Sequence, residues 1–108
     1  MLTEAELTKQ IRDWLDAKGI FYWKQFQASR RGRSGRKGIS DIIGSYVKHI
    51  PGYGEVGLSF SIEVKTEKGK LSRDQARFIG DHICKGKGIA IVARSLEDVI
   101  EGLRVQGK

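Results

Sequence analysis

A strand-helix-strand pattern over residues 58–93 limits the possible folds more than any other segment of the sequence. The stretch "LSFSIEVKT", 58–66, alternates apolar and polar residues, which predicts a strand with one buried face. Residues 72–85 carry apolar residues at helical spacing, and "IAIVA", 89–93, is a continuous β-branched run typical of a strand covered on both faces. A helix that joins two strands of one sheet forms a right-handed crossover, so we expect these two strands to be parallel.

The remaining segments complete an α/β order. We expect a helix over residues 4–18, strands over 20–27 and 40–50, a turn over 51–57, and a last helix over 96–104. Thr3 and Glu6 fit a capping box at the start of the first helix, and Ser72 is a good N-cap for the second. The predicted inward residues are Leu7, Ile11, Trp14 and Leu15 in the first helix, Ala76, Phe78, Ile79 and Ile83 in the second, and Leu96, Val99, Ile100 and Leu103 in the third. The predicted fold is αβββαβα, a mixed central sheet flanked by helices.

Length and composition indicate a single domain, 1–108. A chain of 108 residues supports one core, and 39% hydrophobic with 31% charged residues is typical of a soluble globular protein. No apolar run is long enough to cross a membrane, and the N-terminus lacks a signal core, so we expect a cytoplasmic protein. The lone Cys84 excludes an internal disulfide and is expected to be a partly buried helix residue.

The charge points to a polyanionic partner. Twenty Lys and Arg against thirteen Asp and Glu give a net charge of +7. Nucleic acid is favoured over a membrane surface because no basic amphipathic helix is present, although simple solubility would also explain the balance. The glycine-rich segment 28–38 is predicted to be a DNA-binding loop with Arg30, Arg31, Arg33, Arg36 and Lys37. A second phosphate-contacting patch, or a merely solvated connector, is formed by Lys68, Lys70 and Arg73.

Asp41 is an unusual residue at the mouth of an apolar strand, "GISDIIG". Glu63 and Lys65 lie two apart on the next strand, so their side chains leave the same face. If these strands pair, Asp41, Glu63 and the Val64 carbonyl supply the oxygen ligands that Mg²⁺ prefers. Lys65 would then orient a water or stabilise charge in phosphodiester hydrolysis. An E-x-K pair alone is common on solvated strands, and a lone aspartate can cap a turn; their combination beside a basic loop favours the metal site.

"GISDIIG" followed by "FSIEVKTEKGKLSRDQARFI" resembles the VRR-NUC (virus-type replication-repair nuclease) domain of the PD-(D/E)XK superfamily. The resemblance implies a restriction-endonuclease-like fold with Asp41, Glu63 and Lys65 as motif residues and Gln75 near the active site. The position before the aspartate usually holds proline but is Ser40 here, which changes no ligand. The acidic residue that related nucleases carry on the first helix would fall near Thr8; Glu4, one turn earlier, is the candidate substitute, or an ordinary glutamate favoured by the helix dipole.

The resemblance implies a Mg²⁺-dependent endonuclease, with Mn²⁺ as a substitute, that cuts branched DNA such as Holliday (four-way) junctions as a homodimer in DNA repair or in a phage-infected cell. The alternative is a non-catalytic nucleic-acid-binding module with the same fold. The interface of the dimer is expected from "IFYWKQFQ", "IPGYGEVGL" or both.

Simpler interpretations are preferred for four other residues. His49 and His82 have no partners at metal spacing and are expected at the surface, and Trp14 is expected in the core. Trp23 is either a core residue, the preferred interpretation, or a base-stacking platform.

Overall fold

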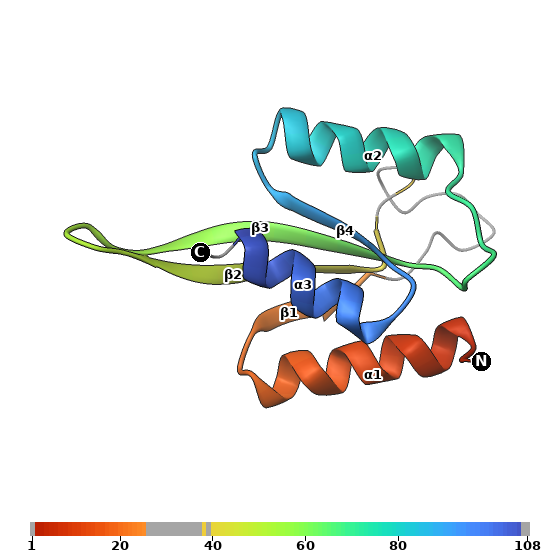
Figure 1. Ribbon diagram of the computed structural model, residues 1–108. Helices are drawn as coiled ribbons and strands as arrows, with labels where there is room; N and C mark the ends of the chain where they lie inside the picture. The colour runs from red at the N-terminus through yellow and green to blue at the C-terminus, as the bar shows by residue number, and fades with distance from the viewer. Residues whose placement is uncertain (1, 26–37, 39, 107–108) are drawn as a thin grey trace.

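The computed structural model describes residues 2–25, 38 and 40–106, and its elements follow the predicted order (Figure 1). The strands form one sheet in the order β1-β2-β3-β4. β1, β2 and β3 pair antiparallel, whereas β3 and β4 pair parallel, which confirms the mixed sheet and the crossover. The elements are α1 (Glu4–Ala17), β1 (Phe21–Lys24), β2 (Ile42–Ile50), β3 (Gly54–Val64), α2 (Arg73–Cys84), β4 (Ile89–Ala93) and α3 (Leu96–Gln106).

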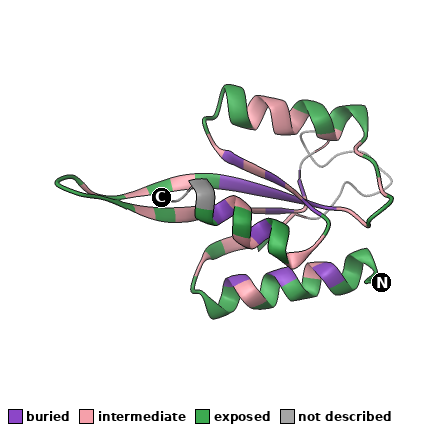
Figure 2. Ribbon diagram, in the orientation of Figure 1, coloured by how far each residue is buried: buried purple, intermediate pink, exposed green. Residues whose placement is uncertain are grey.

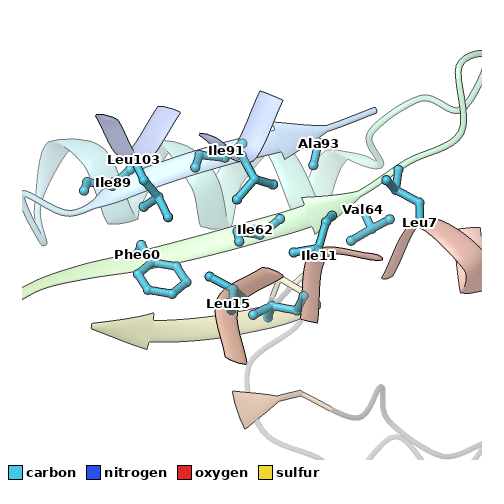
Figure 3. Packing of buried hydrophobic residues seen from close by; sticks show 12 residues of the cluster. Leu7, Ile11, Leu15, Phe60, Ile62, Val64, Ile89, Ile91, Ala93 and Leu103 are labelled. Carbon is cyan, nitrogen blue, oxygen red and sulfur yellow. The ribbon is translucent and has the colours of Figure 1, made fainter. Parts of the chain in front are cut away.

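The hydrophobic core lies between one face of the sheet and the two helices α1 and α3. The alternating residues Phe60, Ile62 and Val64 of β3 are buried on this face, as the sequence predicts. They pack with the α1 stripe, and the capping box between Thr3 and Glu6 fixes the start of that helix. Figure 3 shows the packing, which joins β3 to Leu7, Ile11 and Leu15 of α1, Ile89, Ile91 and Ala93 of β4, and Leu103 of α3.

The opposite face of β3 is polar and lies under α2. The ring nitrogens of His82 hydrogen-bond the hydroxyls of Ser59 and Ser61, the second bond at 2.9 Å. The predicted apolar stripe of α2 is therefore wrong for Ala76 and Ile83, which are exposed, whereas Phe78 and Ile79 are half-buried. No side chain in the fully described range Arg73–Cys84 is completely buried (Figure 2). The predicted surface role of His82 is also wrong, because its ring connects α2 to β3. The polar residues on this face of β3 pack against polar residues of α2, because buried polar groups need hydrogen-bond partners.

β2 and β3 form a long hairpin that extends beyond the helices (Figure 1). The prediction of a turn over 51–57 is wrong for its second half, because Gly54–Gly57 pair with Val47–Ile50. Only the three residues after β2 form the turn, where Gly52 has a positive φ of 81°. Backbone pairing with a neighbouring strand overrides the poor strand propensity of glycine at this site.

The exposed side chains correct two further predictions. Trp23 is 48% exposed and is not a core residue, and Cys84 is exposed rather than partly buried. Trp14 is only half-buried and packs at the edge of the core. His49 is exposed, as predicted. Within the described residues, no helix is long and apolar enough to cross a membrane.

Candidate active site

Asp41 holds the end of β3 through its side chain. β2 begins one residue later, so Asp41 lies where the β2–β3 ladder ends. Its Oδ2 accepts a hydrogen bond from the Val64 N–H at 2.8 Å. The N–H and the C=O of one strand residue point to the same neighbour, so the Val64 carbonyl also faces this side. The carboxylate and the carbonyl predicted as metal ligands are therefore brought together.

Glu63 is buried, 2% exposed, and is held by Gln75 of α2. Gln75 is the third residue of a capping box: its Oε1 accepts from the Ser72 N–H at 2.8 Å, and its own N–H donates to Ser72 Oγ at 3.1 Å. With its amide oxygen bound to the helix cap, the amide nitrogen donates to Glu63 Oε2 at 3.0 Å. The helix start thus orients the glutamine toward the glutamate.

The two carboxyl groups interact strongly. Burial raises the pKa of Glu63, and the adjacent Asp41 carboxylate raises it further, to about 8. The positive charge of Lys65 opposes this shift, while the more distant Glu4 adds to it. Glu63 Oε1 is buried and has no hydrogen-bond partner among the described residues. A cation between the two carboxylates would offset both the repulsion that raises the pKa of Glu63 and the lack of a partner for Oε1, because it favours the ionised carboxylates and binds the free oxygen.

Lys65 is half-buried at the start of the connector between β3 and α2. Its backbone N–H donates to the Ala93 carbonyl at 3.0 Å, which fixes the residue against β4. Arg94 holds the connector from the other side, donating to the carbonyls of Thr66 and Gly69 at 2.6 Å each. The predicted patch residues of this region are all exposed: Lys68, Lys70 and Arg73.

Gly38 explains part of the G-x-x-D spacing. It has a positive φ of 76°, and a Cβ there would lie 2.2 Å from the Asp74 carbonyl oxygen, so only glycine fits against the first turn of α2. Ser40, in the position where the resemblance has proline, is buried, and its hydroxyl has no hydrogen-bond partner in the described part of the chain. Gly38 is thus held by its close contact with α2 and Ser40 by burial.

A cleft between α1 and the ends of β1 and β2 opens beside Asp41. Glu4 and Thr8 of α1 both line it together with Asp41, and Lys24 and Arg12 add positive charge. Glu4 thus reaches the rim of the site, but within residues 2–25, 38 and 40–106 no three His, Cys, Asp or Glu side chains converge as a metal cluster. Glu4 as a metal ligand stays a prediction.

The predicted basic loop falls outside the described residues, since Arg30, Arg31, Arg33, Arg36 and Lys37 all lie within 26–37. One contributor near the site, Arg94, was missed from the sequence, and the contacts of another, Gln75, were not predicted. Gln75 was assigned by resemblance alone, although the S-x-x-Q spacing from Ser72 was a readable capping signal. Arg94 gave no sequence signal, because its carbonyl partners are more than twenty residues away.

The donor set fits a hard divalent cation such as Mg²⁺. Each carboxylate is oriented through one oxygen, Asp41 by the Val64 N–H and Glu63 by Gln75, which leaves the second oxygen for a cation. Two carboxylates, a backbone carbonyl and water match the oxygen ligands of Mg²⁺. The unpartnered Glu63 Oε1 is the structural observation that supports this fit.

Comparisons with known proteins agree with this geometry. The sequence profile of the VRR-NUC domain matches residues 2–97. This chain belongs to the VRR-NUC domain family. A solved structure described as a VRR_NUC domain protein superposes with a TM-score of 0.72 at 19% sequence identity, covering 97% of this chain and 88% of that chain, which shows that the two share a fold. Comparison with curated proteins gives no match. The VRR-NUC assignment supports a nuclease-type domain with DNA as its partner.

Proposed function

We propose that this VRR-NUC domain is a Mg²⁺-dependent DNA endonuclease that hydrolyses phosphodiester bonds in branched DNA, such as four-way junctions. The proposal rests on one observation above all: the Glu63 carboxyl is buried beside the half-buried Asp41 carboxyl with its Oε1 unpartnered, and this setting raises the pKa of Glu63 to about 8. A domain that only binds DNA gains nothing from two carboxylates near phosphates, because they repel the polyanion.

Each residue of the site has a role in this chemistry. Asp41, Glu63 and the Val64 carbonyl would hold the metal, which supplies Lewis-acid polarisation of the phosphate and a more acidic bound water. Lys65 lies on the same strand face as Glu63 and would orient the attacking water or stabilise the charge that develops on the phosphate oxygens. Gln75 would position Glu63 through the hydrogen bond from its amide nitrogen.

Mn²⁺ is expected to replace Mg²⁺, because both ions take octahedral oxygen sites. The exposed cations Lys68, Lys70 and Arg73, together with the basic segment 28–38, would hold the DNA backbone. A homodimer would place two such sites at a fixed separation and allow both strands of a junction to be cut.

The experiment is a nicking assay on a four-way junction, a flap, a duplex and a single strand of equal sequence. We expect cutting of branched substrates with Mg²⁺ or Mn²⁺ and none with EDTA. Binding without cutting under every metal condition would support the alternative, a non-catalytic binding module. Equal cutting of all four substrates would leave a nuclease but remove the selectivity for branched DNA.

A further inference from the structure

Two exposed aromatic rings lie on the edge strand β1, near the proposed active site. Phe21 is 67% exposed and Trp23 is 48% exposed. Their ring centroids are 6.0 Å apart and the rings are tilted by 60°. Large aromatic side chains are normally kept from water, so two exposed rings on one face of one strand indicate a binding surface.

The strand register places these rings on the same sheet face as the catalytic carboxylates. Trp23 pairs with Ile43, and Ile43 pairs with Ser61. Directly opposed residues share a face, and the Ser61 hydroxyl contacts His82 of α2, so Trp23 lies on the α2 side of the sheet. Glu63, two residues beyond Ser61, contacts α2 through Gln75 and thus lies on this face as well.

The separation suits a nucleic-acid strand. Asp41 lies two residues before Ile43 along β2, and β1 is the neighbouring strand. Two residues of rise and one strand spacing put the Trp23 backbone roughly 8 Å from that of Asp41. This distance corresponds to about two nucleotides at the rise of one DNA strand, roughly 3.4 Å per phosphate.

Two cations lie at the edge of β1 between the aromatic rings and the site, although Lys24 alternates with Trp23 along the strand and so starts from the α1 face. Arg12 and Lys24 line both the cleft that contains Asp41 and an adjoining cleft that contains Phe21 and Trp23. Asp16, shared by the two clefts, accepts a hydrogen bond from the Tyr22 hydroxyl at 2.9 Å, which fixes that carboxylate toward β1. Positive groups next to aromatic faces are the usual components of single-strand binding grooves.

We propose that Phe21 and Trp23 form a stacking platform for unpaired bases next to the scissile phosphate. The preferred substrate class is then DNA with a single-stranded or splayed segment beside the cut, rather than uninterrupted duplex. This inference rests on the proposed nuclease function, and it assigns the specificity of that site. The occupant is a nucleobase because the rings share their cleft with two cations, Arg12 and Lys24, against one carboxylate, Asp16, and because the net charge of the chain is +7.

The test measures binding of fluorescent oligothymidine and of a blunt duplex of equal length by anisotropy in EDTA, so no cleavage is needed. Phe21→Ala and Trp23→Ala should each weaken single-strand binding by about 10-fold, with duplex binding changed by less than about 2-fold. Trp23→Phe should restore most of the loss, because it keeps an aromatic face. Ile83→Ala is the matched control: this residue is also exposed, 47%, but lies at the end of α2 away from Gln75.

In a Trp14→Phe background Trp23 is the only tryptophan, and its fluorescence should be quenched by oligothymidine. Absent quenching, or equal losses for single strand and duplex, would overturn the proposal. The proposal would also be overturned if the Phe21→Ala, Trp23→Ala double variant became monomeric in sedimentation while its single-strand affinity stayed unchanged. That face of β1 would then be a protein interface. Failure of the wild type to cut any DNA with Mg²⁺ would instead reject the nuclease function, independently of these binding results.

Discussion

The stability of the protein depends on whether the Glu63 carboxyl is ionised, and the proposed reaction needs the ionised form to hold the metal. Its pKa in the folded protein is raised to about 8, above the ordinary value of 4.5. The stabilising contribution of the protonated group is therefore complete below pH 4.5 and is lost as pH rises through about 8. Glu63→Gln, which imitates the neutral form, should be about 2–4 kcal/mol more stable than wild type at pH 9 without metal, and equal at pH 4.

Urea unfolding in EDTA at the two pH values measures this difference. Glu55→Gln, which removes an exposed carboxylate of the hairpin, is the control and should show no such dependence. Equal stability of Glu63→Gln and wild type at pH 9 would mean that ionising the Glu63 carboxyl does not destabilise the folded protein, contrary to the prediction.

Gln75 combines two tasks that substitutions can separate. Gln75→Glu keeps a capping-box residue but removes the amide that donates to Glu63, so cleavage should fall roughly 10-fold while stability near pH 5 stays close to wild type. Gln75→Ala removes both contacts and should also cost about 1 kcal/mol of unfolding free energy. Glu6→Ala, which breaks the equivalent box on α1, should lose similar stability yet cut normally. Full activity of Gln75→Glu would contradict the positioning role.

At the scale of elements, α2 depends on His82 for its attachment to β3. Burial lowers the pKa of His82, so the folded protein favours the neutral ring. As pH falls below about 6.5, the unfolded chain takes up the proton first, and this contribution to stability is lost. His82→Ala should lower the free energy of unfolding by about 1–3 kcal/mol at pH 8, because two serine hydroxyls lose their partner.

The loss for His82→Ala should shrink between pH 8 and pH 5, which chemical denaturation at both values can check. His49→Ala serves as the comparison, since that histidine is exposed on the hairpin. A loss that is constant with pH would show that the ring is not held in its neutral form.

The sequence predicted the elements better than their faces. The alternation in β3 and the stripe of α1 carried over directly, because apolar residues at strand and helix spacing can be buried in only one way. The contacts of α2 could not be predicted, because its inward residues Gln75 and His82 are polar. Such residues stabilise the packing only where another element, here β3, supplies hydrogen-bond partners such as a serine hydroxyl or a carboxylate. The hairpin tip was misread for a similar reason: its glycines are strand residues only because β2 pairs with them.

The three motif residues were predicted from spacing, and the structure places the Asp41 carboxylate beside Glu63, where it hydrogen-bonds the next residue, Val64. The sequence did not predict the environment of these residues. This environment consists of the burial of Glu63, the orientation of Gln75 by the helix cap, and the hydrogen bonds of Arg94 to the connector. Each depends on distances between elements that only the packed sheet and helices determine.

At the scale of the whole molecule, the hairpin is the expected dimer contact. Val47, Ile50 and Tyr53 are exposed large side chains on a β-ribbon that extends beyond the helices (Figure 1). We expect sedimentation equilibrium at micromolar concentration to give twice the chain mass of 12.1 kDa, and Tyr53→Asp with Val47→Asp to give a monomer. Phe21→Asp is the comparison on β1 and should leave the dimer intact. A wild-type mass near 12.1 kDa would end the dimer proposal.

Asp41, Glu63 and Lys65 are proposed to form a metal-dependent phosphodiesterase site. The direct measurement is the rate of cutting of a labelled four-way junction in Mg²⁺ by wild type and by Asp41→Asn, Glu63→Gln and Lys65→Ala, with junction binding measured in parallel in EDTA. Each substitution should reduce the rate by at least about 100-fold while leaving binding within about 2-fold, because the lost groups act on the reacting phosphate and not on the DNA surface. Cutting by Glu63→Gln at the wild-type rate, or by wild type in EDTA, would contradict the account.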